Sequence, residues 1–164
     1  MKKLISIIVS LIMLLTFSGC GSSISPAKPG YTCNAKISYC DTLNTEAKIS
    51  VIGGGLFSIE ILNPEEIKGL KFNFDNENIT INQYEIENSV LYINDFGGFS
   101  EILNKAFLSI TTGSPELKKK GDTYTYSGNI EGETFIMQFN SDGFPTHLEM
   151  EEEQLTAKFS DWKY

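Results

Sequence analysis

The sequence predicts a mainly β (α+β) protein, an antiparallel sheet of nine or ten strands covered by one amphipathic helix over residues 99–110. Three observations lead to this fold class. From residue 31 onward, apolar and polar residues alternate in run after run, as in strands with one buried and one solvated face. Tight turn signals separate the runs, and short strands joined in this way form antiparallel sheets. The helical period is found in one stretch only.

The first half of the chain contains the clearest strands. Apolar and polar side chains alternate over residues 31–39, 47–51, 57–61, 70–74 and 79–81. Three glycines at 53–55 are typical of a hairpin turn, because glycine adopts positive φ at little cost. A phosphate-binding loop would need a following Lys-Ser/Thr pair or helix start, and neither is present. Residues 64–69 and 75–78 predict turns, and residues 84–93 predict one or two short strands.

One apolar stripe has the helical spacing i, i+3, i+4, i+7, i+8 and i+11. Its members are Phe99, Ile102, Leu103, Ala106, Phe107 and Ile110. Glycines at 97 and 98 precede the stripe, and Gly113 and Pro115 follow it, as at helix boundaries. A helix that docks on a partner would show the same stripe. Because the apolar face of the sheet needs a cover, we expect this helix to lie across it as a lid.

The second half returns to the strand period. A turn is expected at residues 118–120, and strands are expected over 124–126, 134–139, 147–151 and 155–159. Asp142 and Gly143 mark a hairpin turn between two of them. These runs bring the expected total to nine or ten strands.

The N-terminus has the layout of a secretory signal. Lys2 and Lys3 precede an apolar run over residues 4–17, and small residues follow it. A run of 14 residues is shorter than the roughly 20 that a spanning helix needs. We therefore expect a cleaved signal peptide rather than a transmembrane helix.

The end of this signal resembles the lipobox of bacterial lipoproteins. Ser18, Gly19 and Cys20 match the motif, whereas Phe17 stands where leucine is usual. In an ordinary cleaved signal, Cys20 would be a bystander. The resemblance implies instead that residues 1–19 are removed and that Cys20 carries diacylglycerol, whose two chains anchor stably where one anchors only marginally. Residues 20–30 then form the lipidated cysteine and a flexible linker rich in small residues and proline, and residues 31–164 form one domain.

Charge limits the choice of partners. The formal net charge is −8, and loss of Lys2 and Lys3 with the signal peptide takes the mature chain to −10. An acidic surface repels phosphate backbones and anionic headgroups, so nucleic-acid binding and electrostatic membrane docking are both disfavoured. The membrane partner is expected through Cys20, on the extracytoplasmic face of the cell membrane. Lysine is used throughout in place of arginine, and asparagine and isoleucine are frequent. This bias favours a low-GC Gram-positive source.

Few residues carry chemistry. Cys33 and Cys40 lie in one expected strand about 23 Å apart, too far for a disulfide, so we expect free thiols with Cys33 half-buried.

His147 has no second histidine to complete a metal site. The acidic run at residues 149–153 lacks the spacing of a calcium loop and is read as a solvated edge. We expect no enzyme, no metal and no cofactor, although paired carboxylates leave a glycosidase as the least favoured alternative.

The order of these features resembles the LolA/LppX-like superfamily, and more narrowly its small clostridial lipoproteins. A Phe-x-Ile-x-Ile strand runs into an Asn-Pro-x-x-Ile-x-Gly-Leu-x-Phe segment, followed by one helix and four closing strands. The residues involved are Phe57, Ile59, Ile61, Pro64, Gly69, Leu70, Phe72, Phe135, Phe139, Leu148 and Phe159. The resemblance implies a strongly curved half-barrel whose concave apolar face is capped by helical lids. Members carry acyl chains or lipids, sense envelope components or serve as envelope and spore-germination scaffolds.

We expect a binding module for an apolar ligand, and the alternative is a scaffold. In the first, the concave face binds an acyl chain, a lipid or another apolar ligand. Its expected lining is Ile37, Ile49, Phe57, Ile59, Phe72, Phe74, Phe99, Leu103, Phe107 and Phe135. In the second, the domain is a tethered envelope, sporulation or germination scaffold that acts through contacts with an envelope protein or a second copy of itself. A filled interior favours the scaffold, and an open apolar pocket of about 300 Å³ or more favours the carrier.

Overall fold

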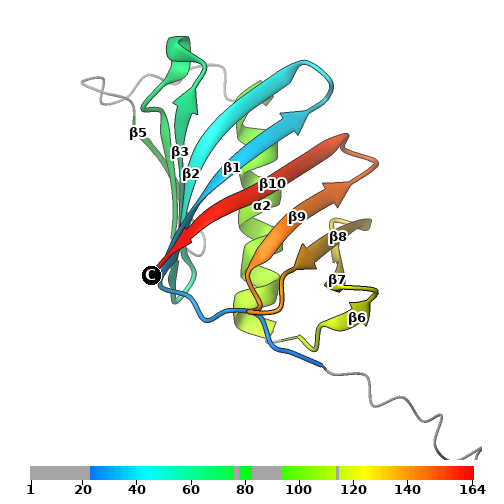
Figure 1. Ribbon diagram of the computed structural model, residues 1–164. Helices are drawn as coiled ribbons and strands as arrows, with labels where there is room; N and C mark the ends of the chain where they lie inside the picture. Colours follow the sequence, from blue (N-terminus) through cyan, green and yellow to red (C-terminus); the bar gives the residue numbers. More distant parts are fainter. Residues whose placement is uncertain (1–22, 76–77, 83–93, 114) are drawn as a thin grey trace, which may run out of the picture.

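The computed structural model describes residues 23–75, 78–82, 94–113 and 115–164. Within these ranges the chain forms ten strands, one 3₁₀ turn and one α-helix (Figure 1). In chain order the elements are β1 (Tyr31–Tyr39), β2 (Leu43–Gly53), β3 (Leu56–Asn63), η1 (Glu65–Ile67), β4 (Lys71–Asp75), β5 (Asn78–Asn82), α2 (Asn94–Gly113), β6 (Lys118–Lys120), β7 (Thr123–Ile130), β8 (Glu133–Phe139), β9 (Pro145–Met150) and β10 (Leu155–Lys163).

All ten strands belong to one open antiparallel sheet in the order β5-β4-β3-β2-β1-β10-β9-β8-β7-β6. The first five strands form one meander and the last five form another. The two meanders are joined where β1 pairs with β10, so the first and last strands lie at the centre of the sheet. The sheet curves around the helix (Figure 1). The predicted antiparallel sheet of nine or ten strands with one helix is confirmed.

The helix α2 crosses the concave face of the sheet (Figure 1). Its predicted stripe is buried apart from half-buried Ile102. The helix is longer than the predicted 99–110, because it begins at Asn94 and ends at Gly113. Gly98 lies inside it, where a Cβ would be 2.7 Å from the Tyr39 hydroxyl. The glycine that looked like a boundary therefore permits close approach of α2 to the end of β1.

The ring of Phe107 joins α2 to both halves of the sheet. It lies 5.2 Å from the ring of Phe57 on β3 and 5.4 Å from that of Phe159 on β10. Such aromatic pairs contribute about 0.5–1.5 kcal/mol each beyond their buried area. Phe107 is thus a main contact of the interior.

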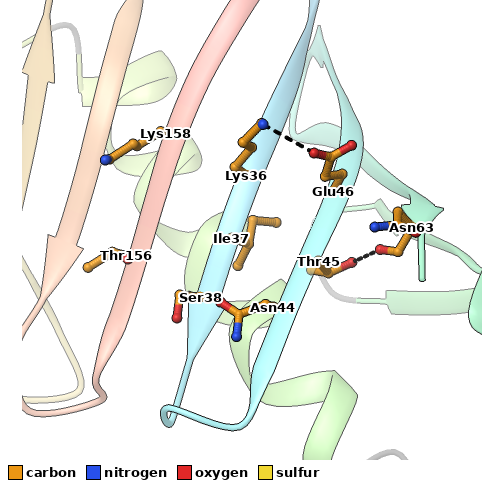
Figure 2. A pocket seen from close by; sticks show the side chains of 9 residues that line it. All are labelled: Lys36, Ile37, Ser38, Asn44, Thr45, Glu46, Asn63, Thr156 and Lys158. Carbon is orange, nitrogen blue, oxygen red and sulfur yellow. Dashed lines mark hydrogen bonds and ion pairs between the residues drawn. The ribbon is translucent and has the colours of Figure 1, made fainter.

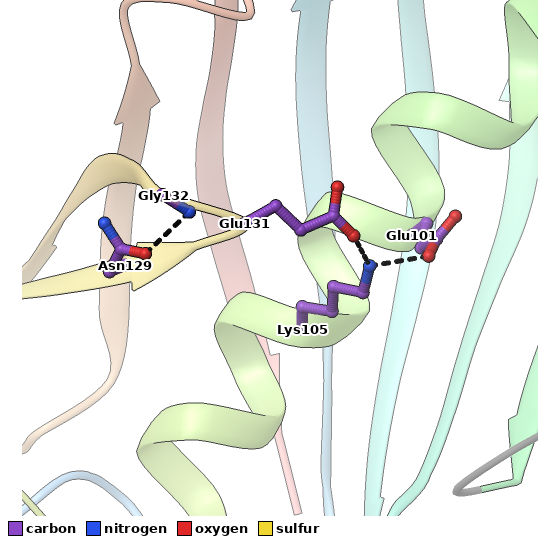
Figure 3. A network of polar contacts seen from close by, with 5 residues as sticks. All are labelled: Glu101, Lys105, Asn129, Glu131 and Gly132. Atoms are coloured by element: carbon purple, nitrogen blue, oxygen red, sulfur yellow. Dashed lines mark hydrogen bonds and ion pairs between the residues drawn. The ribbon is translucent and has the colours of Figure 1, made fainter.

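An ion-pair network fixes the helix to a turn of the second meander. The Lys105 ammonium lies 2.7 Å from a Glu101 carboxylate oxygen one helical turn away, and it also donates to Glu131 in the β7–β8 turn (Figure 3). In the same turn, the Gly132 N–H donates to Asn129 Oδ1. Hydrogen bonds from Lys105 hold the pKa of Glu131 below its ordinary value.

The neighbouring Glu133 has the opposite environment. Partial desolvation raises the pKa of its carboxyl group, and the negative charges of Glu153, Glu152 and Glu131 add to the shift. Its Oε2 is enclosed and accepts no hydrogen bond. Acidic residues of the β7–β8 and β9–β10 turns are therefore close enough to repel one another.

The N-terminal tail is attached to the domain from Ile24 onward. The Leu117 N–H donates to the Ile24 carbonyl in an isolated β-bridge, the Ala27 N–H donates to Gly143, and the Gly30 N–H donates to Val51. A Cβ at Gly143 would lie 2.5 Å from the carbonyl oxygen of Ser25. The part of the expected flexible linker 20–30 that the structure describes is thus held against the domain over residues 24–30.

Several local expectations change in the structure. Residues 118–120, expected to be a turn, form the edge strand β6, because their backbone pairs with β7. Residues 64–69 contain the 3₁₀ turn η1, and the glycines at 53–55 form the β2–β3 hairpin turn as predicted. The strands expected over 84–93 and part of the turn expected over 75–78 lie outside the described residues.

We predict that Phe107→Ala lowers the free energy of unfolding by about 3–5 kcal/mol, because it removes a buried ring that contacts both halves of the sheet. Urea denaturation followed by circular dichroism measures the loss. Leu108→Ala, at a half-buried position on the same helix, is the matched control and should cost less. Equal losses for the two variants would contradict the bridging role of Phe107.

We predict that Glu133→Gln raises the melting temperature at pH 7. The pKa of Glu133 is higher in the folded state than in the unfolded state, so its charged form destabilises the fold at neutral pH. The gain should disappear as the pH falls below the unfolded-state value of about 4.3, where the carboxyl group is neutral in both states. Thermal unfolding from pH 3.5 to 8 measures this, with exposed Glu116→Gln as the charge-matched control. A gain that is constant with pH would be the contrary result.

Candidate functional site

The ten residues expected to line an apolar site all lie in the space between sheet and helix. Each is no more than 4% exposed, and together they belong to one continuous core. The alternation along the strands places seven on the concave face, and α2 contributes the other three. The structure therefore brings the predicted residues together, but as packed neighbours of one another.

Side chains fill the space that the ten residues line, because no more than 4% of any of them is accessible. The gap found there, between α2 and the β2–β3 hairpin, has a volume of about 10 Å³. A single water needs about 10–15 Å³ by this measure. In this conformation the side chains of α2 occupy the place that an acyl chain would take.

A larger hollow of about 380 Å³ lies on the opposite, outer face of the sheet (Figure 2). It spans the central strands β2, β1 and β10, where the outward side chains are polar. Its lining is Lys36, Ile37, Ser38, Asn44, Thr45, Glu46, Asn63, Thr156 and Lys158. The side chain of Ile37 points into the core, so the hollow itself offers ammonium, hydroxyl, amide and carboxylate groups.

Positive charge is concentrated along one row of this face. Lys36 lies opposite Lys158 in the β1–β10 register, and Lys158 lies opposite His147 in the β10–β9 register. Like charges directly opposite in a sheet repel one another. Lys36 is partly neutralised by Glu46, 3.3 Å away. The hollow therefore favours an anionic or strongly hydrogen-bonding group beside Lys158.

A second hollow of about 230 Å³ adjoins the first toward the β9–β10 turn. The two share Ser38 and Thr156, and the second is lined by Asp41, Glu149 and Glu151 among others. The outer face thus changes from basic to acidic along the central strands. A partner that follows both hollows would need an acidic part and a basic part.

The hollow was missed by sequence reasoning, and the reason is topological. Its residues are the polar members of the same alternating runs that identified the core. They become neighbours only because β10 returns to pair with β1. The alternation shows that Lys36 and Lys158 face solvent, but not that they face each other.

The described residues show little catalytic chemistry. They contain no group of three or more His, Cys, Asp or Glu side chains placed to hold a metal ion. His147 Nε2 lies 4.0 Å from Glu149 Oε2. Burial raises the pKa of Tyr39 to about 12, with Cys40 and Glu153 adding to the shift. Its hydroxyl donates to Glu153 at 3.4 Å, so Tyr39 acts as a structural donor here.

The two cysteines of the domain are free thiols, as expected, but the expected half-burial of Cys33 was wrong. Cys33 is 2% exposed on the concave face, and burial raises the pKa of its thiol. Cys40 is exposed in the β1–β2 turn, where its sulfur lies 3.7 Å from the Glu153 carbonyl. Cys20 lies outside the described residues. Within the described part of the chain, no helix has the length and apolar character needed to cross a membrane.

No protein-family model and no curated protein matches this chain. Among solved structures, it is similar to a LolA superfamily protein from Nitrosomonas europaea, with 8% identity and a TM-score of 0.33 over 88% of this chain and 86% of that one. Values this low do not place the chain in that superfamily. The architecture and the site described above rest on this chain's own strand order and contacts.

We predict that one domain thiol reacts in the native protein and two react after unfolding. In the full chain carrying Cys20→Ser, Cys40 should be labelled quickly by a maleimide reagent, and Cys33 only in denaturant, because it is buried and its thiolate is disfavoured. Mass spectrometry of the labelled chain counts the thiols, and Cys40→Ser is the control that should show none under native conditions. Rapid native labelling of Cys33 would show that the interior opens.

Proposed function

We propose that this chain is a membrane-anchored extracytoplasmic lipoprotein whose domain is a non-catalytic scaffold and binds its partner through the outer face of the central strands. The anchor is diacylglycerol on Cys20. The scaffold proposal rests on one observation. The concave face is filled by α2, whereas a polar hollow of about 380 Å³ lies on the opposite face.

The placement of the hollow supports this function. Its floor is formed by β1 and by its two neighbours β2 and β10, each hydrogen-bonded on both sides. Groups on such strands are held more rigidly than groups on loops, which lowers the entropy lost on binding. The partner chemistry that fits is a polar segment with an acidic group for Lys158, carried by an envelope protein or by a second copy of this chain.

Binding of an acyl chain or another apolar ligand is the second candidate. The observation in its favour is the continuous apolar surface formed by the ten predicted residues under a single helix. A ligand would have to displace α2, together with the contacts of Phe107 and the ion pairs of Lys105. The filled interior makes this the weaker proposal.

We predict that Cys20→Ala releases the protein from the membrane fraction. Without the cysteine there is no site for diacylglycerol, whose two acyl chains give stable anchoring. Detergent-free fractionation of cells producing wild-type and variant protein measures the change. Cys40→Ala, which removes an exposed thiol elsewhere, is the control and should stay in the membrane fraction. A Cys20→Ala variant that stays attached as firmly as wild type would overturn the anchor.

The choice between scaffold and carrier is tested by two measurements on one preparation. Protein purified from its host should yield no co-purified lipid beyond the covalent anchor. A photo-cross-linking residue at Thr156, in the hollow, should give one defined product, whereas the same residue at exposed Thr112 on α2 should not. The mass of the product separates a second copy from another protein. A stoichiometric extracted lipid, with no product from Thr156, would favour the carrier instead.

A further inference from the structure

We propose that the end of the domain where the N-terminal tail leaves is a membrane-contact surface, which lies on the headgroup layer of an anionic bilayer. We call this end the near rim. It consists of the β2–β3 hairpin, the attached tail from Ile24, the strand β6 and the C-terminal end of β10, which lie at one end of the sheet (Figure 1). The inference rests on the proposed anchor at Cys20 and adds an orientation to it.

The length of the free tether places the near rim close to the bilayer. Ile24 is the first of the described residues that is hydrogen-bonded to the domain, and Cys20 lies four positions before it in the sequence. Four residues span at most about 14 Å when fully extended. Ile24 pairs with Leu117, directly before β6, so the tether begins on the rim itself.

Exposed apolar side chains are concentrated on this rim. Five large hydrophobic residues among those described are exposed. Ile52, Leu56 and Tyr164 lie on the near rim, and Ile79 lies at the same end of the sheet, at the start of β5. Ile52 and Leu56 flank the glycine turn at 53–55. A Cβ at Gly53 would lie 3.1 Å from the side chain of Pro29, so this hairpin adjoins the tail. These side chains lie along the path of the tail rather than at Ile24, and exposed apolar side chains at this end of the sheet have a natural partner in the outer part of the bilayer.

An aromatic cluster continues the same surface. Phe144 stacks on Trp162 at 5.2 Å and contacts Tyr164 at 5.5 Å. Phe144 follows Gly143, which accepts the hydrogen bond from Ala27 of the tail. Tryptophan and tyrosine are enriched at membrane–water interfaces, because one end of each side chain is apolar and the other is polar.

The two ends of the sheet differ in net charge, because the near rim is close to neutral and the opposite end is acidic. The edge strand β6 consists of three exposed lysines at residues 118–120, next to the tether point. The four tight turns at the opposite end are acidic. They contain Asp41, Glu65, Glu66, Glu131, Glu151, Glu152 and Glu153. The near rim also carries exposed Glu116, Asp122, Asp142 and Asp161, which nearly balance its lysines. The acidic end would be repelled by anionic headgroups more strongly than the near rim, and β6 would be attracted to them, so the net negative charge orients the domain instead of preventing contact.

The test uses Trp162, because the chain contains one tryptophan. The mature lipoprotein is reconstituted into vesicles of phosphatidylcholine and phosphatidylglycerol, and flotation measures anchoring. A fraction of the phosphatidylcholine carries a nitroxide on its headgroup, which quenches nearby tryptophan. We expect the protein to float and the Trp162 fluorescence to fall relative to vesicles without nitroxide.

Two groups of variants test the components of the rim. A lysine near an anionic surface changes the contact equilibrium by about fivefold, so Lys118→Gln, Lys119→Gln and Lys120→Gln together should abolish most of the quenching. The matched control neutralises Lys48, Lys68 and Lys71, which lie away from the rim, and should retain it. Ile52→Ser with Tyr164→Ser should also reduce quenching, whereas Ile136→Ser, an exposed site midway along β8, should not.

Each result decides the proposal. Flotation with nitroxide quenching that depends on residues 118–120 supports it. Flotation without quenching overturns the contact surface but leaves the anchor in place. If the β6 variant and its control reduce the quenching equally, the domain approaches the bilayer non-specifically, and the proposed contact surface is also overturned. Failure to float overturns the anchor itself, and the orientation with it.

Discussion

The packing of one helix against a curved sheet is the interaction on which the structure depends. The two meanders are joined in the sheet by the β1–β10 ladder, and a ten-stranded open sheet with an apolar face cannot remain solvated on that face. α2 covers it, and Phe107 contacts β3 in one meander and β10 in the other. Burial of the stripe therefore holds the two halves at a fixed curvature as well as providing a core.

The same packing determines where binding can take place. A concave face that needs a cover can take it from a ligand or from its own chain, and here the chain supplies it. The Lys105 network adds a polar attachment at the edge of the helix, which a simple apolar lid would lack. With the inner face occupied, the outer face of the same central strands offers a hollow of about 380 Å³, and its chemistry is polar.

The sequence predicts the strands and the helix of this fold better than it predicts which segments lie next to one another. A period of two is a local property, so the strands and their buried faces follow from residues such as Ile49 and Phe135 alone. The start of the helix does not follow from the local sequence. Gly98 lies inside the helix because a Cβ there would meet Tyr39, whereas the sequence alone shows only that glycine is a weak helix former. The lysines of β6 and the tail at Ile24 were misjudged for a similar reason. Their structure comes from hydrogen bonds to segments far away in the sequence.

The pairing of the first strand with the last links this topology to the tether. A chain whose first strand lies at the edge of a sheet can leave from the side, but β1 lies at the centre. The tail must then cross the end of the sheet, and it does so along the β2–β3 hairpin and the turn that contains Gly143 until it reaches β6. The lipid proposed on Cys20, four residues before Ile24, would draw that whole end toward the bilayer. With that anchor in place, the acidic turns and the outer-face hollow would face away from the bilayer, where the proposed partner could reach them.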